Sequence, residues 1–217
     1  MAHRLVELGG SVAVLNMASR QNPGGGVRHG AGAQEEYLFR CSNYFRSLYQ
    51  FVWYASEYNL EERAALYPLD RDYGGAYSPD VTVFRGTEKE GYPKLEQPWK
   101  VAFIAVAALN KPELVIDSAG QYWLSPALVE PTKRKIRTIY RIALEHGHDQ
   151  MVLGAFGCGA FANPPAHIAR LFHEVLREDE FSLAFSHIVF AIVENHNSYS
   201  WFNPEGNFKP FKREFGV

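Results

Sequence analysis

The sequence predicts an α/β protein of three layers, α/β/α, in which helices cover both faces of a largely buried central sheet. Short apolar runs rich in β-branched residues alternate along the chain with longer segments of helical periodicity. The clearest run is residues 101–109 (VAFIAVAAL), and its unbroken hydrophobicity is typical of a strand buried on both faces. We expect one domain, residues 1–217, because this length suits a single domain with a sizeable core.

Apolar runs predict the strands, and apolar residues at helical spacing predict the helices. We expect strands at residues 12–17, 81–84, 101–109, 114–117, 151–156 and 187–193. We expect helices at residues 34–54, 60–67, 132–146, 164–177 and 208–215, with Thr132 as an N-cap and Gly147 just beyond a helix end. The composition indicates a frayed start at residues 3–10 and loops at residues 70–80, 88–98 and 195–206. The sequence leaves the strand order open.

One stretch connects the first predicted strand to the first predicted helix and contains the most informative residues. Three glycines, residues 24–26, follow the strand, and the helix opens with Gln34, Glu35 and Glu36. Glycine lets the backbone approach a ligand closely, and backbone N–H groups ahead of a helix bind anions such as phosphate. Carboxylates beside such a loop suit sugar hydroxyls or a leaving oxygen that needs a proton. A ligand with both phosphate groups and sugar hydroxyls fits this arrangement.

A second glycine loop, residues 157–163, follows the strand predicted at residues 151–156. Ligands of open α/β sheets bind beyond the carboxyl ends of the strands, so the two loops could flank one cleft. The alternative is that both loops are only tight connections. Glu35 and Glu36 should have different roles, because adjacent helical positions point about 100° apart. Acidic residues in a first turn can also simply favour the helix dipole.

Residues 12–36 resemble the poly(ADP-ribose) glycohydrolase family, whose motif is three glycines, a short spacer and Gln-Glu-Glu. Here the spacer runs from Val27 to Ala33. Three further segments resemble the microbial branch of this family, namely residues 81–85 (VTVFR), 154–165 (GAFGCGAFANPP) and 206–216 (GNFKPFKREFG). The resemblance covers nearly the whole chain. The resemblance does not include an N-terminal extension, because the chain begins almost at the first core strand. The lack of this extension could widen the site and change the substrate.

The resemblance implies a macrodomain fold with a mixed sheet. It also implies hydrolysis of ribose–ribose O-glycosidic bonds in poly(ADP-ribose), with release of ADP-ribose from the chain end. Glu36 is then the general acid and later the base, Glu35 holds the ribose next to the scissile bond, and Gln34 orders the pair. The transition state is oxocarbenium-like and its leaving oxygen needs a proton. We therefore expect Glu36 to be partly buried and partly protonated near neutral pH.

The resemblance assigns substrate contacts to both glycine loops. From the first loop we expect contacts from Gly24, Gly25, Gly26 and Val27. From the second loop we expect N–H groups facing the diphosphate at Gly157, Cys158, Gly159 and Ala160. The same resemblance implies that the attacking water is positioned by the diphosphate and the first loop.

Two asparagines and one aromatic residue complete the implied site. An asparagine binds the terminal ribose hydroxyls, and we favour Asn22 over Asn16. Phe161 packs on the same ribose. The residues alone also allow a turn role for Asn22 and a core position for Phe161. We do not expect Cys158 to be a nucleophile, because no nearby sequence offers a histidine partner.

Composition narrows the partners and cofactors. A formal net charge of −2 provides no general attraction for a polyanion, so we expect no direct DNA binding. The eight histidines show no metal-binding spacing, and we expect neither a metal nor a cofactor. The two cysteines do not indicate a disulfide framework, and we see no signal peptide or membrane-length apolar run. We therefore expect an intracellular protein of the cytoplasm or nucleus, without a membrane partner.

The resemblance implies that the substrate is poly(ADP-ribose) or an ADP-ribosylated protein and that the product is ADP-ribose. It also implies a role in reversing ADP-ribosylation, for example in the DNA damage response. Two rival functions stay open. One is a macrodomain reader that binds ADP-ribose with little activity, and the other is a hydrolase that removes mono-ADP-ribose from proteins. The adenine-binding residues also stay open, with candidates at Glu7, Tyr199, Trp201, Phe202 and Phe208.

Overall fold

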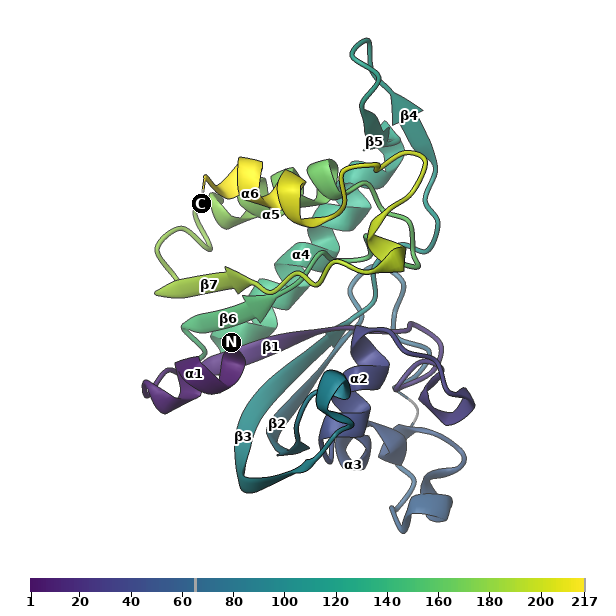
Figure 1. Cartoon of the computed structure of the whole chain (residues 1–217), viewed down its shortest axis with the longest axis vertical. Helices are drawn as coiled ribbons and strands as arrows, with labels where there is room; N and C mark the ends of the chain where they lie inside the picture. Colours follow the sequence, from purple (N-terminus) through teal and green to yellow (C-terminus); the bar gives the residue numbers. More distant parts are fainter. Residues whose placement is uncertain (65, 217) are drawn as a thin grey trace.

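The computed structural model describes residues 1–64 and 66–216 and has three layers (Figure 1). A five-stranded sheet in the order β2-β3-β1-β6-β7 forms the middle layer. The strands β3, β1, β6 and β7 run parallel to one another, and β2 pairs antiparallel with β3. The sheet strands are β1 (Val12–Met17), β2 (Gly75–Arg85), β3 (Lys94–Val106), β6 (Gln150–Leu153) and β7 (His187–Phe190). The predicted three-layer α/β/α fold with a mixed sheet is confirmed.

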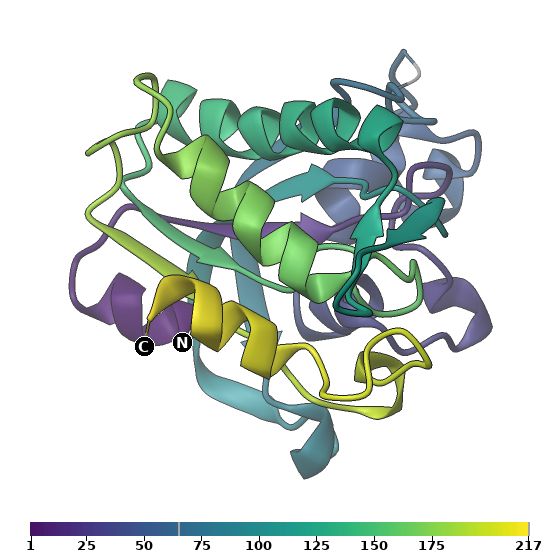
Figure 2. The same ribbon diagram turned by 90° about the horizontal axis from the view of Figure 1, so that it is seen from above.

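Helices cover both faces of this sheet. On one side lie α4 (Pro126–Glu145), α5 (Pro165–Leu176) and α6 (Phe208–Phe215), which Figure 2 shows together. On the other side lie α1 (Ala2–Glu7), α2 (Gln34–Cys41) and α3 (Phe45–Leu48). A separate two-stranded sheet, β4 (Leu114–Ile116) and β5 (Tyr122–Leu124), precedes α4. Short 3-10 turns complete the chain: η1 (Val27–His29), η2 (Tyr49–Phe51), η3 (Ala55–Tyr58), η4 (Glu88–Glu90) and η5 (His196–Ser198).

The alternation of side chains along β1 explains why both faces need a cover. Ala13 and Leu15 belong to the core beneath α4 and α5, whereas Val12 and Val14 belong to the core beneath α2 and α3. Successive strand residues point to opposite faces, so an apolar run buries one set of side chains on each side. β3 repeats the pattern, with Ile104 in the first core and Phe103 in the second.

The long helix predicted at residues 34–54 is wrong beyond Cys41. The backbone after α2 instead pairs with β2: the Asn43 N–H donates to the Thr82 carbonyl at 3.0 Å, and the Thr82 N–H donates to Asn43 Oδ1 at 2.8 Å. Beyond α2, the apolar residues of the predicted helix lie on α3 and η2 and in the turns beside them. Here tertiary pairing overrides a helical pattern in the sequence.

The helix predicted at residues 60–67 does not form in the described part of that segment, and residue 65 lies outside the described residues. The Arg63 N–H donates across to the Gln50 carbonyl at 2.6 Å, and Pro68 disfavours helical backbone at Tyr67. The helix predicted to begin at Thr132 begins at Pro126 instead, with Pro131 inside it. Residues 3–10 are not simply frayed, because α1 forms there and buries Leu5.

β2 and β3 are longer than the strands predicted at residues 81–84 and 101–109. They pair from Gly75 opposite Val106 to Arg85 opposite Lys94, so residues 75–80 and 94–98 are strand rather than loop. In β2, the Pro-Asp dipeptide of residues 79–80 lies where the register with β3 shifts. This irregularity explains the loop-like composition of residues 75–80. At their carboxyl ends β3, β6 and β7 stop three residues before the predicted ends at 109, 156 and 193.

Ile139→Ala tests the core beneath α4. Ile139 is fully buried, so its truncation should lower the free energy of unfolding by about 2–5 kcal/mol, through lost burial and a residual cavity. Ile116→Ala is the matched control, because Ile116 is 58% exposed on β4 and should change stability by about 0.5 kcal/mol or less. Denaturant unfolding measures both values. Equal effects of the two substitutions on stability would contradict the burial of Ile139 in this core.

Candidate active site

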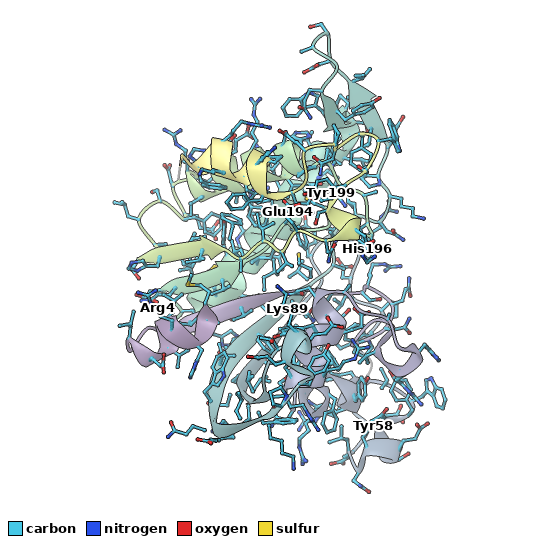
Figure 3. The ribbon with its side chains drawn as sticks, viewed as in Figure 1. Arg4, Tyr58, Lys89, Glu194, His196 and Tyr199 are labelled. Carbon is cyan, nitrogen blue, oxygen red and sulfur yellow. The ribbon has the colours of Figure 1, made fainter. Side chains whose placement is uncertain are left out.

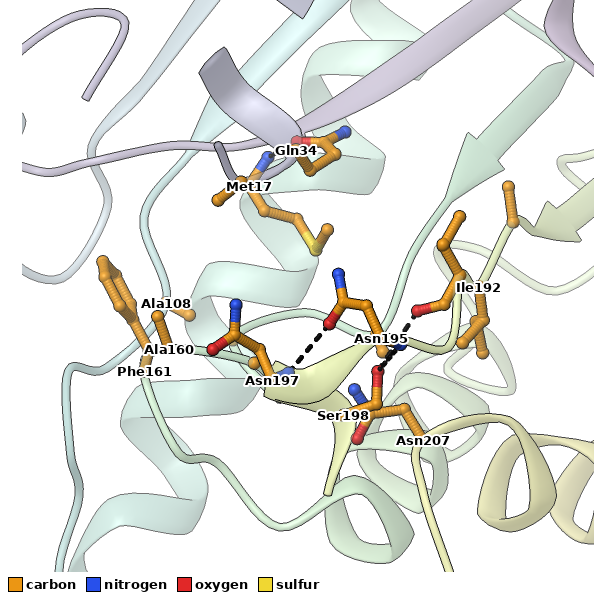
Figure 4. Close-up of a pocket in the computed structure, with 16 residues that line it drawn as sticks. Met17, Gln34, Ala108, Ala160, Phe161, Ile192, Asn195, Asn197, Ser198 and Asn207 are labelled. Atoms are coloured by element: carbon orange, nitrogen blue, oxygen red, sulfur yellow. Dashed lines mark hydrogen bonds between the residues drawn. The ribbon is translucent and has the colours of Figure 1, made fainter. Parts of the chain in front are cut away.

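A cleft opens beyond the carboxyl ends of the four parallel strands, where α/β sheets bind ligands. Its volume is about 170 Å³. Met17 at the end of β1 and Gln34 at the start of α2 form one wall, Ala160 and Phe161 form another, and the loop after β7 forms the third (Figure 4). The second glycine loop therefore lines this cleft together with Met17, Ala33 and Gln34. Gly24, Gly25 and Gly26 are not among the lining residues, so the expectation that both glycine loops flank one cleft stays a prediction.

The second glycine loop is held in shape by Asn163. Asn163 is buried, and its Nδ2 donates to the carbonyls of Leu109 at 2.7 Å, Gly157 at 3.1 Å and Phe161 at 3.2 Å. Gly157 has a φ of +73°, and a Cβ there would lie 2.5 Å from the Cβ of Ala108. The loop therefore requires glycine at this position.

This loop presents backbone donors to the cleft. Within the described residues, the N–H groups of Gly157, Gly159, Ala160 and Phe161 donate to no protein acceptor, as an anion-binding loop requires. The Cys158 N–H is already bonded to the Ala155 carbonyl at 3.0 Å. Burial raises the pKa of the Cys158 thiol well above its ordinary value, which agrees with its exclusion as a nucleophile.

Glu35 lies beneath the first glycine loop and is only 3% exposed. Its Oε2 accepts the Ser19 N–H at 2.7 Å, and its Oε1 accepts the Gly24 N–H at 3.0 Å and Asn16 Nδ2 at 3.2 Å. Burial raises its pKa to about 7, the charge of Glu36 adds to this rise, and the hydrogen bonds oppose it. Glu35 is thus a carboxyl group that titrates near neutral pH.

Glu36 connects the first glycine loop to the start of α2. Its Oε1 accepts the Gly26 N–H at 2.8 Å, and its Oε2 accepts the Ala33 N–H at 2.9 Å. Glu36 is 6% exposed, so the expected burial is present. The two neighbouring carboxylates have different partners, as the helical geometry predicts.

Gln34 fixes the start of α2 to the end of β1. Its Oε1 accepts the Met17 N–H at 3.0 Å, and its Nε2 donates to the Leu15 carbonyl at 2.6 Å. The amide thus bonds the strand as a neighbouring strand would. This geometry supports the predicted ordering role, and it places the Gln34 side chain in the cleft wall as well.

The remaining predicted residues are distributed between the cleft and its support. Phe161 is half-buried and lines the cleft, so its alternative role in the core is wrong. Asn16 is fully buried and bonds Glu35 and Tyr44 Oη, which gives it a supporting position. Asn22 is exposed, and its carbonyl accepts the Gly25 N–H at 3.0 Å, the turn role that its sequence also allowed. Val27 begins η1.

The loop after β7 supplies cleft residues that the sequence analysis missed. Asn195 Oδ1 accepts the Asn197 N–H at 2.9 Å, and Ser198 Oγ donates to the Val193 carbonyl at 3.2 Å, so this loop is internally braced. Figure 3 shows Glu194, His196 and Tyr199 along the same segment. The only sequence signal was a run of amide and hydroxyl residues, which is equally typical of a surface turn.

The aromatic residues considered for adenine do not line this cleft. Trp201, which is 76% exposed, and Phe202 line a separate pocket beside Tyr122. Phe208 lines an apolar groove beside β7. Glu7 lies before β1, at the opposite end of that strand from the cleft.

The chain is similar to known poly(ADP-ribose) glycohydrolases. Residues 1–86 match the family model described as the microbial-type PARG catalytic domain. The structure superposes on poly(ADP-ribose) glycohydrolase from Thermomonospora curvata bound to the inhibitor ADP-HPD with a TM-score of 0.75, at 34% identity over 99% of this chain and 74% of that chain. The chain belongs to the microbial-type poly(ADP-ribose) glycohydrolase family.

A second family member supports the same assignment. Poly(ADP-ribose) glycohydrolase from Deinococcus radiodurans in complex with ADP-ribose superposes with a TM-score of 0.73, at 33% identity over 99% of this chain and 79% of that chain. A comparison with curated protein sequences finds no match. The resemblance in the sequence is thus confirmed, as are the macrodomain-like fold and the enzyme class, poly(ADP-ribose) glycohydrolase.

Among the residues that the structure describes, no helix combines the length and hydrophobicity that crossing a membrane requires. The described residues also contain no group of three His, Cys, Asp or Glu side chains that could hold a metal ion.

Gly25→Ala tests the contact between the first glycine loop and the carboxylates of this glycohydrolase. Gly25 has a φ of +56°, and a Cβ there would lie 2.4 Å from Glu36 Oε1 and 3.1 Å from Glu35 Oε2. The variant should displace both groups and lower turnover by about 100-fold. Gly30→Ala is the control, because Gly30 shares the positive φ but has no atom within 4 Å of that position. Equal turnover of the two variants would contradict the contact.

The pH dependence of stability tests the raised pKa of Glu35. The carboxyl ionises near its ordinary pKa of 4.5 in the unfolded chain and near pH 7 in the folded protein. The folded state therefore binds more protons between these values, and the stability contributed by Glu35 is lost as the pH rises from about 4.5 to 7. Relative to Glu35→Gln, the wild type should lose up to about 3 kcal/mol between pH 4.5 and 8. Denaturant unfolding at four pH values measures this difference, and parallel profiles would refute it.

Proposed function

We propose that the chain hydrolyses the ribose–ribose O-glycosidic bonds of poly(ADP-ribose) and releases ADP-ribose, with Glu36 as the general acid. The observation that carries the proposal is the docking of Gln34-Glu35-Glu36 against the end of β1 and the first glycine loop, beside a cleft with free backbone donors. This arrangement offers carboxylates for ribose hydroxyls and N–H groups for a diphosphate.

The proposed reaction uses Glu36 twice. The bond between the anomeric carbon and the leaving ribose oxygen breaks, and that oxygen takes the Glu36 proton to become a hydroxyl. A water then forms the new bond to the anomeric carbon and gives a proton to the Glu36 carboxylate, which restores the acid. Each Glu36 oxygen accepts one backbone N–H, so each keeps a second lone-pair site that can carry the proton given to the leaving oxygen.

Glu35 is proposed to hold the ribose beside the scissile bond. Its Oε2 accepts one hydrogen bond, from Ser19, and keeps capacity for a ribose hydroxyl. Asn16 holds the other oxygen and fixes the orientation of the carboxyl group. Phe161 is proposed to pack on the terminal ribose, and the second glycine loop to bind the diphosphate, as supported by their places in the cleft wall.

We further propose that the substrate is carried by ADP-ribosylated proteins, and that the chain acts in the cytoplasm or nucleus to reverse this modification, including in the DNA damage response. The free, buried cysteines Cys41 and Cys158 support a reducing compartment. Release from the chain end is part of the same proposal.

Glu36→Gln tests the acid. The variant keeps the size of the side chain but has no proton to give, so release of ADP-ribose from an automodified, poly(ADP-ribosyl)ated protein should fall at least about 100-fold. ADP-ribose binding, measured by calorimetry, should change by no more than about threefold, because Glu36 stabilises the transition state rather than the product. Glu145→Gln, exposed at the end of α4, is the control and should retain full activity.

The same assay separates the rival functions. A wild-type protein that binds ADP-ribose but releases none would be a reader. A protein that releases ADP-ribose only from singly modified acceptors would be a mono-ADP-ribosyl hydrolase. Retained turnover in Glu36→Gln would remove Glu36 as the acid.

A further inference from the structure

A continuous row of aromatic rings runs beneath the first glycine loop and returns to it through Arg28. Phe39 and Tyr49 are buried and lie 5.5 Å apart between ring centroids. Tyr49 then contacts Tyr54 at 5.3 Å and Tyr58 at 4.7 Å, both in edge-on geometry. We call these four rings together with Arg28 the aromatic brace. Edge-on pairs of this kind are favourable beyond their burial.

Arg28 closes the brace from the loop side. It belongs to η1, two residues after Gly26, and its guanidinium carbon lies 4.3 Å from the Tyr54 ring centroid and 5.9 Å from that of Tyr58. The Arg28 Nη2 also donates to Glu57 Oε2 at 2.8 Å. An exposed ion pair contributes little alone, but a planar guanidinium stacked on a ring and paired with a carboxylate has one fixed position.

The other end of the brace touches the same loop. A Cβ on Gly24 would lie 2.7 Å from Phe39 Cε1, so the Phe39 ring packs directly against the Gly24 backbone. The loop is therefore held on both flanks of its glycines, by Phe39 at Gly24 and by Arg28 beyond Gly26. Residues 45–58, which contain α3, η2 and η3, form the lobe that carries Tyr54 and Tyr58. Figure 3 shows Tyr58 on this lobe, far from the loop after β7.

The held segment contains the donors that orient the two carboxylates. The Gly24 N–H donates to Glu35, and the Gly26 N–H donates to Glu36. A shift of the loop would change both hydrogen bonds at once, and misplacement of a reacting group by about 1 Å can cost about 100-fold in rate.

We infer that Arg28 is a positioning residue, which acts through the aromatic brace to hold the glycine loop against Glu35 and Glu36. Arg28 does not need to touch the substrate for this role. The inference rests on the proposed glycohydrolase function for its effect on rate, but the ordering of the loop can be measured without any substrate.

The experiment compares Arg28→Met with Arg46→Met by hydrogen exchange and by kinetics. Arg46 is an exposed arginine of the same lobe, and it forms no ion pair or cation–π contact with any residue that the structure describes. Arg28→Met should speed amide exchange of the peptide that covers residues 24–31 at least about tenfold, leaving the peptides of α4 and α5 unchanged. Its kcat should fall about 10- to 100-fold, with a smaller change in ADP-ribose affinity.

Two further variants separate positioning from general stability. Arg28→Lys keeps the charge and should recover several-fold of the lost kcat. In Arg28→Met combined with Tyr54→Leu, the loss should be no greater than in Arg28→Met alone, because the two residues act through one contact.

The outcomes distinguish the inference from the proposed function. If Arg28→Met speeds exchange at residues 24–31 and the wild type hydrolyses no poly(ADP-ribose), the brace is supported and the proposed function is refuted. Unchanged exchange at residues 24–31, or an equal rise over the whole chain, would overturn the inference whatever the activity. So would additive losses in the double variant.

Discussion

The structure around the cleft depends on carboxylates that accept backbone N–H groups from a glycine loop. Glu35 and Glu36 together bond Ser19, Gly24, Gly26 and Ala33, so the loop and the start of α2 form one unit. These bonds replace the water that two buried carboxylates would lose, and without them the burial would be costly. The same bonds fix the distance between the residue assigned as acid and the backbone expected to face the substrate. Stability and the geometry of the site therefore rest on the same contacts.

The sheet supplies the second requirement, which is the meeting of distant segments. β1 lies between β3 and β6, and all three are parallel, so the loops that follow them open at one edge. Gln34 attaches α2 to the end of β1, and Asn163 attaches the second glycine loop to the segment after β3. The Gln34 amide bonds backbone groups of Leu15 and Met17, and the Asn163 amide bonds the Leu109 carbonyl beyond the end of β3. Two walls of the cleft, the start of α2 and the second glycine loop, are thus each fixed by one side-chain amide.

The motif residues were recognisable because their chemistry is local. Three glycines, a spacer and Gln-Glu-Glu lie within one connection, and the second loop follows one strand, so neither requires knowledge of the fold. The prediction of one helix over residues 34–54 was wrong beyond Cys41 because Asn43 bonds β2, a strand some forty residues later in the chain. The strands at residues 75–80 and 94–98 were missed because a hairpin can tolerate Gly, Pro and charged residues when each strand completes the other's hydrogen bonds. The cleft residues Asn195 and Asn197 had no distinguishing signal, since amides are common in any surface turn.

The sequence by itself determined the layers of this protein and the segments that carry its chemistry. Hydrophobic periodicity reports burial directly, and the glycine and carboxylate pattern is contiguous. Only the tertiary structure decided the strand order, the third wall of the cleft, and the separate placements of Glu35, with its pKa near 7, and Glu36. Only the tertiary structure reveals the aromatic brace as well, because the sequence pattern of its aromatic residues is equally typical of ordinary core residues. These features depend on desolvation and on contacts between residues far apart in the chain, and neither quantity is written in the local sequence.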